Sequence, residues 1–377
     1  MSINVVIDSN YLFHKTFGIF SGFGAKNPGD VLSSEADKTM FIRKVITDLS
    51  YSLNQIPDLG TVIFCRDSRS WRKDFKITRS VYKESRVKEK GVDWSSFFNL
   101  LEELGNYLST KGFIYSKYQG AEGDDLIWAW TEYFRERGEK TIVLSGDKDM
   151  HQLTSYDGSS WIGVWTSNSK NNRLIVSDNW KLEEDQQTTI FDVTPSSGES
   201  RLKMEKLLSS CQLDKVNVKE YVFKKILAGD KKDDVPGVFP HMTKSGKMSN
   251  IADGKASKIW EAYLQTSWKD IPLESIWKDE EFLSWVAGIT LRMTGQTDSK
   301  ENRETFKKFY EENARLVWLS PETLPESLVQ SLREHTIIYG KDSLKIISLD
   351  KKSLIEQSQW ASEAAPPKGF DPFELFN

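Results

Sequence analysis

Residues 119–153, QGAEGDDLIWAWTEYFRERGEKTIVLSGDKDMHQL, contain the clearest structural pattern in this chain. Apolar side chains recur at helical spacing from Leu126 to Phe134, and Gly138 is a typical helix stop. The run TIVL that follows is apolar and has the length of a buried strand. This stretch therefore predicts a helix followed by a strand.

Acidic side chains flank this helix and strand on both sides: Glu122, Asp124, Asp125, Asp147 and Asp149. A strand that ends in Asp-x-Asp exposes its carboxylates at the carboxyl edge of an α/β sheet, where such folds place their sites. Acids brought to one place repel one another unless cations neutralise them, and oxygen ligands suit Mg²⁺ or Mn²⁺. The sequence therefore predicts a metal site. For the first three acids taken alone, favourable interaction with the dipole of the helix start is the better explanation.

Two earlier apolar runs also end in aspartate, at Asp8 and at Asp67. One aspartate after a strand is commonplace, because Asp caps the helix that follows. Three such endings, counting Asp147, are harder to explain in that way. If strands alternate with helices, neighbouring strands are parallel and their carboxyl ends meet at one edge. We expect an α/β fold with a mostly parallel central sheet flanked by helices.

A basic segment follows Asp67. Residues 66–90 contain ten Lys or Arg and four acids, in a chain whose net charge is -4. A solvated charged loop is the usual explanation for such a run. Here the cations are interleaved with Trp71, Phe75 and Tyr82, and cations that contact phosphate beside aromatics that stack on bases are what single-stranded nucleic acid requires. The segment favours nucleic-acid binding.

The composition indicates a globular chain of two domains, with 377 residues and 38% hydrophobic content. No apolar run approaches the roughly 18 residues of a membrane span, and the first residues lack the pattern of a signal peptide. Cys65 and Cys211 are too few for a disulfide framework or a zinc site. We expect a cytoplasmic protein that makes no membrane contact.

The second half of the chain reads as helices interrupted by polar segments. A hairpin is expected at 161–177 and a surface excursion at 182–211. A helix at 218–227 leads to Asp230, Asp233 and Asp234, and further helices are expected at 280–293, 305–318 and 324–334. The basic stretch 244–258 suits contact with backbone phosphate, although an ordinary loop explains it about as well. Residues 351–368 have a linker composition and precede the apolar ending GFDPFELFN.

Six of these motifs together resemble the flap endonuclease superfamily of structure-specific 5′-nucleases, and most closely its ribonuclease H members from T-even bacteriophages. The motifs are VVIDSN, FCRDSRSWRKDF, VYKESR, AEGDDL, LSGDKDMHQL and KILAGDKKDDV, in that order over residues 3–238. The resemblance implies a PIN-like 5′-nuclease domain at 1–235 and a C-terminal helical domain that binds duplex DNA at 236–350. It implies a 5′-to-3′ exonuclease or flap endonuclease that removes RNA primers and adjacent DNA at 5′ ends during lagging-strand replication.

The same resemblance implies roles for individual residues. Two divalent ions, Mg²⁺ or Mn²⁺, would be held by Asp8, Asp67, Glu122, Asp124, Asp147, Asp149, Asp230 and Asp233, with Asp125 and Asp234 as supporting candidates. The catalytic residues would be Asp8, Asp67, Asp147 and the basic pair Lys83 and Arg86, which the family places on a helical arch, here residues 66–92. Together with the basic stretches, it predicts nucleic-acid contacts at Arg69, Arg72, Lys73, Lys76, Arg79, Lys83, Arg86, Lys244, Lys247 and Lys255.

One departure from the family concerns its second-domain signature, Gly-Val-x-Gly-Ile-Gly, which grips duplex DNA through a potassium ion. This chain has GVFPHMTKSGKMSNIADGK there, so that ion and that mode of duplex binding are not implied. The resemblance still implies the cleavage chemistry.

The apolar ending predicts a protein contact. Its large side chains, Phe370, Phe373, Leu375 and Phe376, either fold back on the body or dock on a partner. Within the segment 351–377, a linker and a terminal interaction motif, the hydrophobic and acidic motif resembles the peptides by which phage replication enzymes hold their sliding clamp. A single-stranded DNA-binding protein is a second expected partner. We expect a monomer.

Two other functions explain parts of the same pattern. A small PIN-type ribonuclease shares the acid-bearing sheet but does not explain the basic segment or the C-terminal helices. A non-catalytic DNA-binding scaffold with a nuclease-like fold predicts gaps in the acid set, and every matched position is filled.

Overall fold

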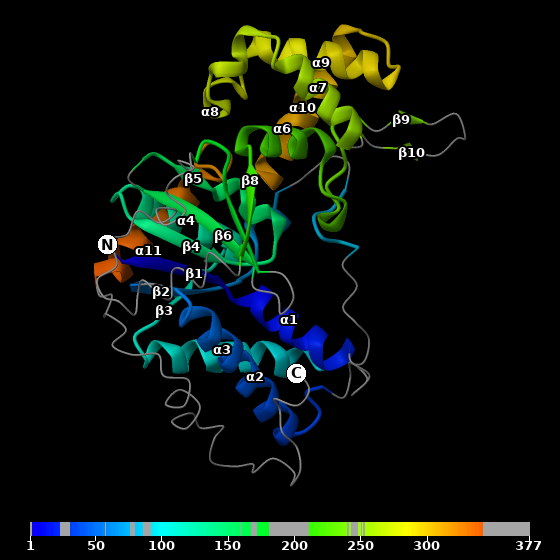
Figure 1. The fold of residues 1–377 in the computed structure, drawn as a ribbon. Helices are drawn as coiled ribbons and strands as arrows, with labels where there is room; N and C mark the ends of the chain where they lie inside the picture. The colour runs from blue at the N-terminus through cyan, green and yellow to red at the C-terminus, as the bar shows by residue number, and fades with distance from the viewer. Residues whose placement is uncertain are drawn as a thin grey trace.

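The computed structural model describes residues 2–22, 31–56, 58–75, 80–85, 92–158, 160–166, 172–180, 211–239, 241–242, 248–249, 251 and 253–341. Within these residues, a sheet lies between helices on both of its faces, and a second group of helices stands over one end of it (Figure 1).

The sheet has its strands in the order β3-β2-β1-β4-β6-β7-β8, with β5 paired to β6. The strands are β1 (Ile3–Asp8), β2 (Leu59–Arg66), β3 (Ile114–Lys117), β4 (Lys140–Leu144), β5 (Ser155–Tyr156), β6 (Trp161–Thr166), β7 (Asn172–Ser177) and β8 (Cys211–Val216). All pairs are parallel except β5–β6 and β6–β7. The predicted α/β class with a mostly parallel sheet is confirmed, and β6 and β7 pair as the predicted hairpin.

Alternating side chains of the central strands build a core on each face of the sheet. Val5 belongs to the cluster formed with α1 (Ser9–Gly22), α2 (Glu35–Leu53) and α3 (Trp94–Ser109), whereas its neighbour Val6 belongs to the cluster formed with α4 (Gly123–Arg135). The full burial of both side chains fixes the register of β1, because a shift by one residue would exchange the two faces.

The helical layer above the sheet has its own core. The layer consists of α6 (Val218–Ala228), α7 (Asp253–Tyr263), α8 (Leu273–Ile276), α9 (Glu280–Thr294) and α10 (Lys300–Val317) (Figure 1). Phe223, Tyr263, Phe282 and Tyr310 are fully buried at its centre. A short hairpin, β9 (His241–Met242) and β10 (Met248–Ser249), lies beside this layer.

The last described helix, α11 (Glu326–Lys341), returns to the sheet and packs on α4. Leu332 is fully buried in the same cluster as Trp130. Trp130 Nε1 donates to Ser116 Oγ at 2.8 Å, and that hydroxyl lies 3.0 Å from His335 Nε2 of α11. Residues 319–341 therefore complete the core of the sheet layer, while the domain boundaries at 235 and 350 stay a prediction.

The predicted helices at 218–227, 280–293, 305–318 and 324–334 are present as α6, α9, α10 and α11. The predicted excursion at 182–211, apart from Cys211, and the segment 351–377 lie outside the described residues. In the part of the chain that is described, no helix combines the length and the apolar character needed to cross a membrane.

Candidate functional site

Four carboxylates come together at the carboxyl edge of the sheet, on its three central parallel strands and the helix beside them. Asp8 ends β1, Asp67 follows β2, Asp147 follows β4, and Asp124 lies in the first turn of α4. Because β1 pairs with both β2 and β4, their carboxyl ends are adjacent. The structure thus brings together four residues that sequence reasoning placed in the site.

Backbone amides and small polar side chains orient two of these carboxylates. Asp8 accepts hydrogen bonds from the Tyr11 amide at 2.9 Å and from Ser145 Oγ at 2.8 Å. Asp67 accepts from the amide of Gly123 and from Asn10 Nδ2. An added Cβ at Gly123 would lie 2.8 Å from Asp67 Oδ1, so only glycine allows this approach.

The pKa values of the group show that its charges repel one another. Burial, partly offset by its hydrogen bonds, and then the charges of Asp67 and Asp147 together raise the pKa of Asp8 to about 6. Burial, followed by the charges of Asp8 and Asp147, raises the pKa of Asp124 well above its ordinary value. Burial and the charge of Glu122 raise the pKa of Asp67. Added positive charge at this edge would stabilise all four ionised groups.

Glu122 and Asp125 are neutralised by a buried arginine. Arg72, 2% exposed, donates to both oxygens of Asp125, at 2.8 and 3.1 Å, and to Glu122 at 3.1 Å. Asp125 also accepts from the Glu122 amide at 2.9 Å and so caps α4. Two predictions are thereby corrected. Asp125 is committed to Arg72 and the helix cap rather than to a metal, and Arg72 is too deeply buried to contact nucleic acid.

Tyr82 and Lys83 extend this network toward the helical layer. Tyr82 is 5% exposed, so it does not offer a ring for base stacking. Its hydroxyl lies 3.1 Å from Glu122 and 3.0 Å from Asp233 and can donate its one proton to either carboxylate. Lys83 donates to Glu122 at 2.7 Å, lies 3.7 Å from Asp233, and has a left-handed backbone with φ 57°. Against the opposing effect of burial, Arg72 and Lys83 lower the pKa of Glu122.

A second group of acids is held by a lysine that sequence reasoning missed. Lys225, in the last turn of α6, pairs with Asp149 and lies 3.1 Å from Asp230. Tyr221 also donates to Asp149, at 3.2 Å. Burial opposes the charge of Lys225, but its two carboxylate partners raise its pKa. The sequence signal was the placement of Lys225 one helical turn before the Gly-Asp that ends α6.

The turn that carries Asp230 depends on a glycine. Gly229 has φ 71° and ψ -164°, a region that only glycine occupies readily, and an added Cβ would lie 2.3 Å from the Val235 carbonyl oxygen. Asp234 accepts from the Ser85 amide at 2.7 Å, so this predicted supporting ligand instead anchors the segment that holds Lys83.

A narrow cavity of about 20 Å³ is lined by acids of both groups: Glu122 and Asp124, and Asp149, Asp230 and Asp233. Among the described residues, no three His, Cys, Asp or Glu side chains form a group that could hold a metal ion as they stand. The donor set nevertheless suits a hard divalent cation, because Asp8, Asp67 and Asp124 offer only oxygen and repel one another. Lys83 and Lys225 neutralise the remaining acids.

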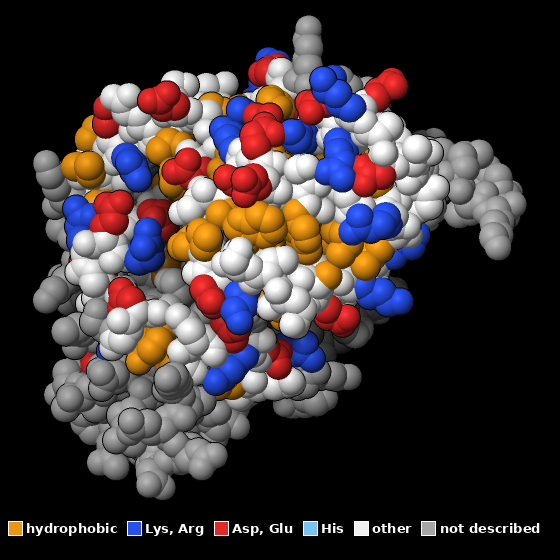
Figure 2. Space-filling view, turned by 90° about the horizontal axis from the view of Figure 1, so that it is seen from above, with side chains coloured by type: hydrophobic (Ala, Val, Ile, Leu, Met, Phe, Trp, Pro, Cys, Tyr) orange, Lys and Arg blue, Asp and Glu red, His pale blue; other side chains and the backbone are white. Residues whose placement is uncertain are grey.

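The predicted nucleic-acid contacts are only partly described. Arg69 and Lys73 are exposed, Arg69 pairs with Asp74 at 2.8 Å, and Lys255 is half-buried in α7. Lys76, Arg79, Arg86, Lys244 and Lys247 lie outside the described residues, as do Phe370, Phe373, Leu375 and Phe376. Figure 2 shows a face on which a strip of hydrophobic side chains is bordered by both acidic and basic ones. This face therefore carries no continuous basic patch in its described part.

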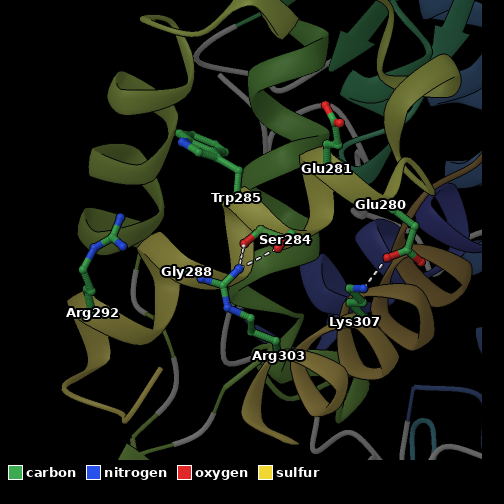
Figure 3. Close-up of a pocket in the computed structure, with 8 residues that line it drawn as sticks. All are labelled: Glu280, Glu281, Ser284, Trp285, Gly288, Arg292, Arg303 and Lys307. Carbon is green, nitrogen blue, oxygen red and sulfur yellow. Dashed lines mark hydrogen bonds and ion pairs between the residues drawn. The ribbon is translucent and has the colours of Figure 1, made fainter. Parts of the chain in front are cut away.

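A larger hollow, of about 560 Å³, lies between α9 and α10. Figure 3 shows Lys307 paired with Glu280 and Arg303 bonded to Ser284, while Arg292 and Trp285 stand on the α9 side. Its lining has cations and acids in near balance and includes none of the carboxylates at the sheet edge. We therefore assign the chemistry to the acidic cavity and not to this hollow.

Comparison with known proteins relates part of the chain to a nuclease family. Residues 4–185 match the family described as 5′-3′ exonuclease, N-terminal resolvase-like domain. The chain is 27% identical over 124 residues to ribonuclease H of Enterobacteria phage T4, covering 30% of this chain and 39% of that protein. It is 24% identical over 155 residues to the 5′-3′ exonuclease of Buchnera aphidicola subsp. Schizaphis graminum (strain Sg), covering 40% and 47%. It thus spans less than half the length of these curated relatives.

Two solved structures from T5 have a similar chain path. A T5 protein co-crystallised with metal ions shares 11% identity at a TM-score of 0.49, covering 89% of this chain and 98% of that one. The T5 5′-exonuclease with bound divalent metal ions (zinc) shares 14% identity at a TM-score of 0.46, covering 89% and 99%. The family match and the mostly parallel sheet together show that residues 4–185 are similar to the N-terminal resolvase-like domain of 5′-3′ exonucleases.

Proposed function

We propose that this protein is a divalent-metal-dependent 5′-nuclease that hydrolyses phosphodiesters at the 5′ ends of duplexes, acting as a 5′-to-3′ exonuclease and flap endonuclease. The observation that carries the proposal is the meeting of Asp8, Asp67, Asp124 and Asp147 at the carboxyl edge of a 5′-3′ exonuclease domain. RNA primers with the adjacent DNA are the proposed substrates, in phage lagging-strand replication.

Two Mg²⁺ ions, or Mn²⁺, would supply an activated water and stabilise the attacking and leaving oxygens. The residues suited to hold the first are Asp8, Asp67, Asp124 and Asp147. Asp149, Asp230 and Asp233 would hold the second, which would replace Lys225 as the partner of Asp149 and Asp230. Ser145 orients Asp8 and also accepts from the Asp147 amide at 3.0 Å, so one hydroxyl sets two of the acids. The chain's own contribution is thus a preorganised set of oxygen atoms.

Digestion of labelled duplexes tests the proposal directly. We expect the protein to shorten nicked, flapped and RNA-primer hybrid duplexes from their 5′ ends in Mg²⁺ and to leave them intact in chelator. Asp147→Asn should bind these duplexes but not cut them, because Asp147 is exposed and its substitution spares the fold. Cleavage in chelator, or normal turnover by Asp147→Asn, would refute the proposal.

Lys83 is expected to act on the phosphate rather than only to bind it. Lys83→Met should lower the single-turnover cleavage rate about 100-fold or more at saturating protein, since one electrostatic stabiliser is lost beside Glu122. The matched control is Lys117→Met, because Lys117 pairs with Glu102 at the same 2.7 Å but on the outer strand β3. A normal rate for Lys83→Met, with only weaker binding and a smaller salt dependence, would restrict Lys83 to backbone contact.

The sliding clamp and the single-stranded DNA-binding protein stay predictions, because the terminal side chains that would reach them lie outside the described residues. A PIN-type ribonuclease or a non-catalytic scaffold is less well supported. Leu316, Val317 and Leu319, at the end of α10 and just after it, line the acidic cavity. Neither rival function needs the helical layer of α6 to α10 to contribute to this cavity.

A further inference from the structure

The end of α10 is joined to the carboxylate cavity by side chains from outside the helix. The last carbonyl groups of a helix have no partner within it. Arg72 Nε donates to the Leu316 carbonyl oxygen at 3.2 Å, and Gln152 Nε2 donates to that of Val317 at 3.2 Å. Both donors come from segments that carry or neutralise acids of the site.

Gln152 connects α10 with Asp149. It lies in the 3-10 helix η3 (Lys148–Leu153) and is 8% exposed. Its Oε1 accepts from the Leu319 amide at 2.8 Å, and its Nε2 donates to the Asp149 carbonyl oxygen at 2.9 Å as well as to Val317. One side chain therefore fixes the backbone of Asp149 against the chain that leaves α10.

Asn313 makes the equivalent link to the turn after α6. Its side chain is fully buried, and its Nδ2 donates to the carbonyl oxygens of Ile226 at 2.8 Å and Pro236 at 2.9 Å. These two carbonyls bracket the turn that carries Asp230 and Asp233. Asn313 therefore holds both ends of this turn at the helix.

We infer that Arg72, Gln152 and Asn313 are positioning residues through which the end of α10 sets the spacing of the carboxylates. Arg72 holds Glu122 of α4, Gln152 holds η3, and Asn313 holds the turn after α6. The inference rests on the proposed function and deepens it, because it makes the helical layer part of the carboxylate site. Groups that orient ligand residues commonly change metal affinity or activity about 10- to 100-fold when removed.

The test uses Gln152→Met in the full chain, since methionine has a similar volume but cannot make these hydrogen bonds. We expect its affinity for Mn²⁺, measured by calorimetry, to fall about 10- to 100-fold. The kcat for a flapped duplex should fall in parallel while KM is unchanged. Without metal, amide hydrogen exchange should be faster both in η3 and at residues 229–235. Asn313→Leu should give the same pattern at residues 229–235, and it replaces Gln152→Met if that variant does not fold.

The matched control is Ser116→Ala. Ser116, like Gln152, is buried and links two other segments, through Trp130 and His335, but neither of these side chains carries or orients an acid of the site. Loss of the Ser116 hydroxyl should lower the stability of the protein and leave its affinity for Mn²⁺ unchanged.

The inference is overturned if Gln152→Met binds Mn²⁺ as tightly as Ser116→Ala does and exchanges as the wild type does in η3. If the wild-type protein neither binds Mn²⁺ nor cleaves, the proposed function fails, and the exchange measurement alone then decides the inference. Faster amide hydrogen exchange in η3 and at residues 229–235 supports the inference, and exchange at the wild-type rate overturns it.

Discussion

Arg72→Met is expected to lower the free energy of unfolding by about 3–5 kcal/mol, the cost of leaving a buried charge without its partner. Arg72 is 2% exposed and Asp125 is fully buried, so no water can replace the guanidinium that Asp125 loses. Methionine fills part of the volume but donates no hydrogen bond. Urea unfolding near neutral pH, followed by tryptophan fluorescence, measures the difference.

Arg69→Met is the matched control for this prediction. Arg69 belongs to the same basic segment and pairs with Asp74 at 2.8 Å, but their side chains are 66% and 67% exposed. Such surface pairs contribute about 0–1 kcal/mol, because water screens them and both side chains lose freedom. If the two variants lost the same free energy of unfolding, Arg72 would not be the buried centre of the network.

Asp8→Asn is expected to abolish activity and to make the metal-free protein more stable. Burial raises the folded pKa of Asp8 from 3.8 to about 6. An acid whose folded pKa lies above its unfolded value costs stability when ionised, about 3 kcal/mol at most. The full cost applies at pH values above the pKa of the folded state, and it disappears at pH values below the pKa of the unfolded state. Asparagine keeps the shape and one acceptor oxygen without the charge.

In chelator, Asp8→Asn should therefore unfold at higher urea concentration than the wild type near pH 8, and the difference should vanish near pH 4. Its cleavage rate in Mg²⁺ should fall at least about 100-fold. Asp298→Asn serves as the control, because Arg303 lowers the pKa of this exposed carboxylate and it lies far from the site. A stability gain that does not depend on pH would contradict this explanation.

The fold was predictable because apolar runs and their aspartate endings are local features of the sequence. Asp8, Asp67 and Asp147 each follow a strand, and parallel pairing alone places them side by side. The antiparallel hairpin at 161–177 needed only a short-range pattern, whereas the order of the strands, which depends on long-range pairing, was not predicted. For these elements the local signals and the tertiary structure agree.

The partners of individual charged side chains were not predictable. Arg72 was counted as one of ten cations in a basic run, and a count of charges contains no information about burial. Its role depends on Asp125 and Leu316, which are 53 and 244 residues away in the sequence. Lys225 was overlooked for the same reason, since its pairing with Asp149 exists only after α6 has docked.

The packing of α11 on α4 has a consequence for the order in which the protein is made. Leu328 and Leu332 cover Trp130 and Phe134, so the sheet layer buries this face only with residues synthesised about 200 positions later. On the ribosome, the N-terminal part of the chain must wait with that surface exposed, which is a hazard for aggregation. Helix α4, whose first turn carries Asp124, is therefore covered on this face only when nearly the whole described chain has emerged. Until then, a partly translated chain holds this carboxylate on an incompletely packed helix.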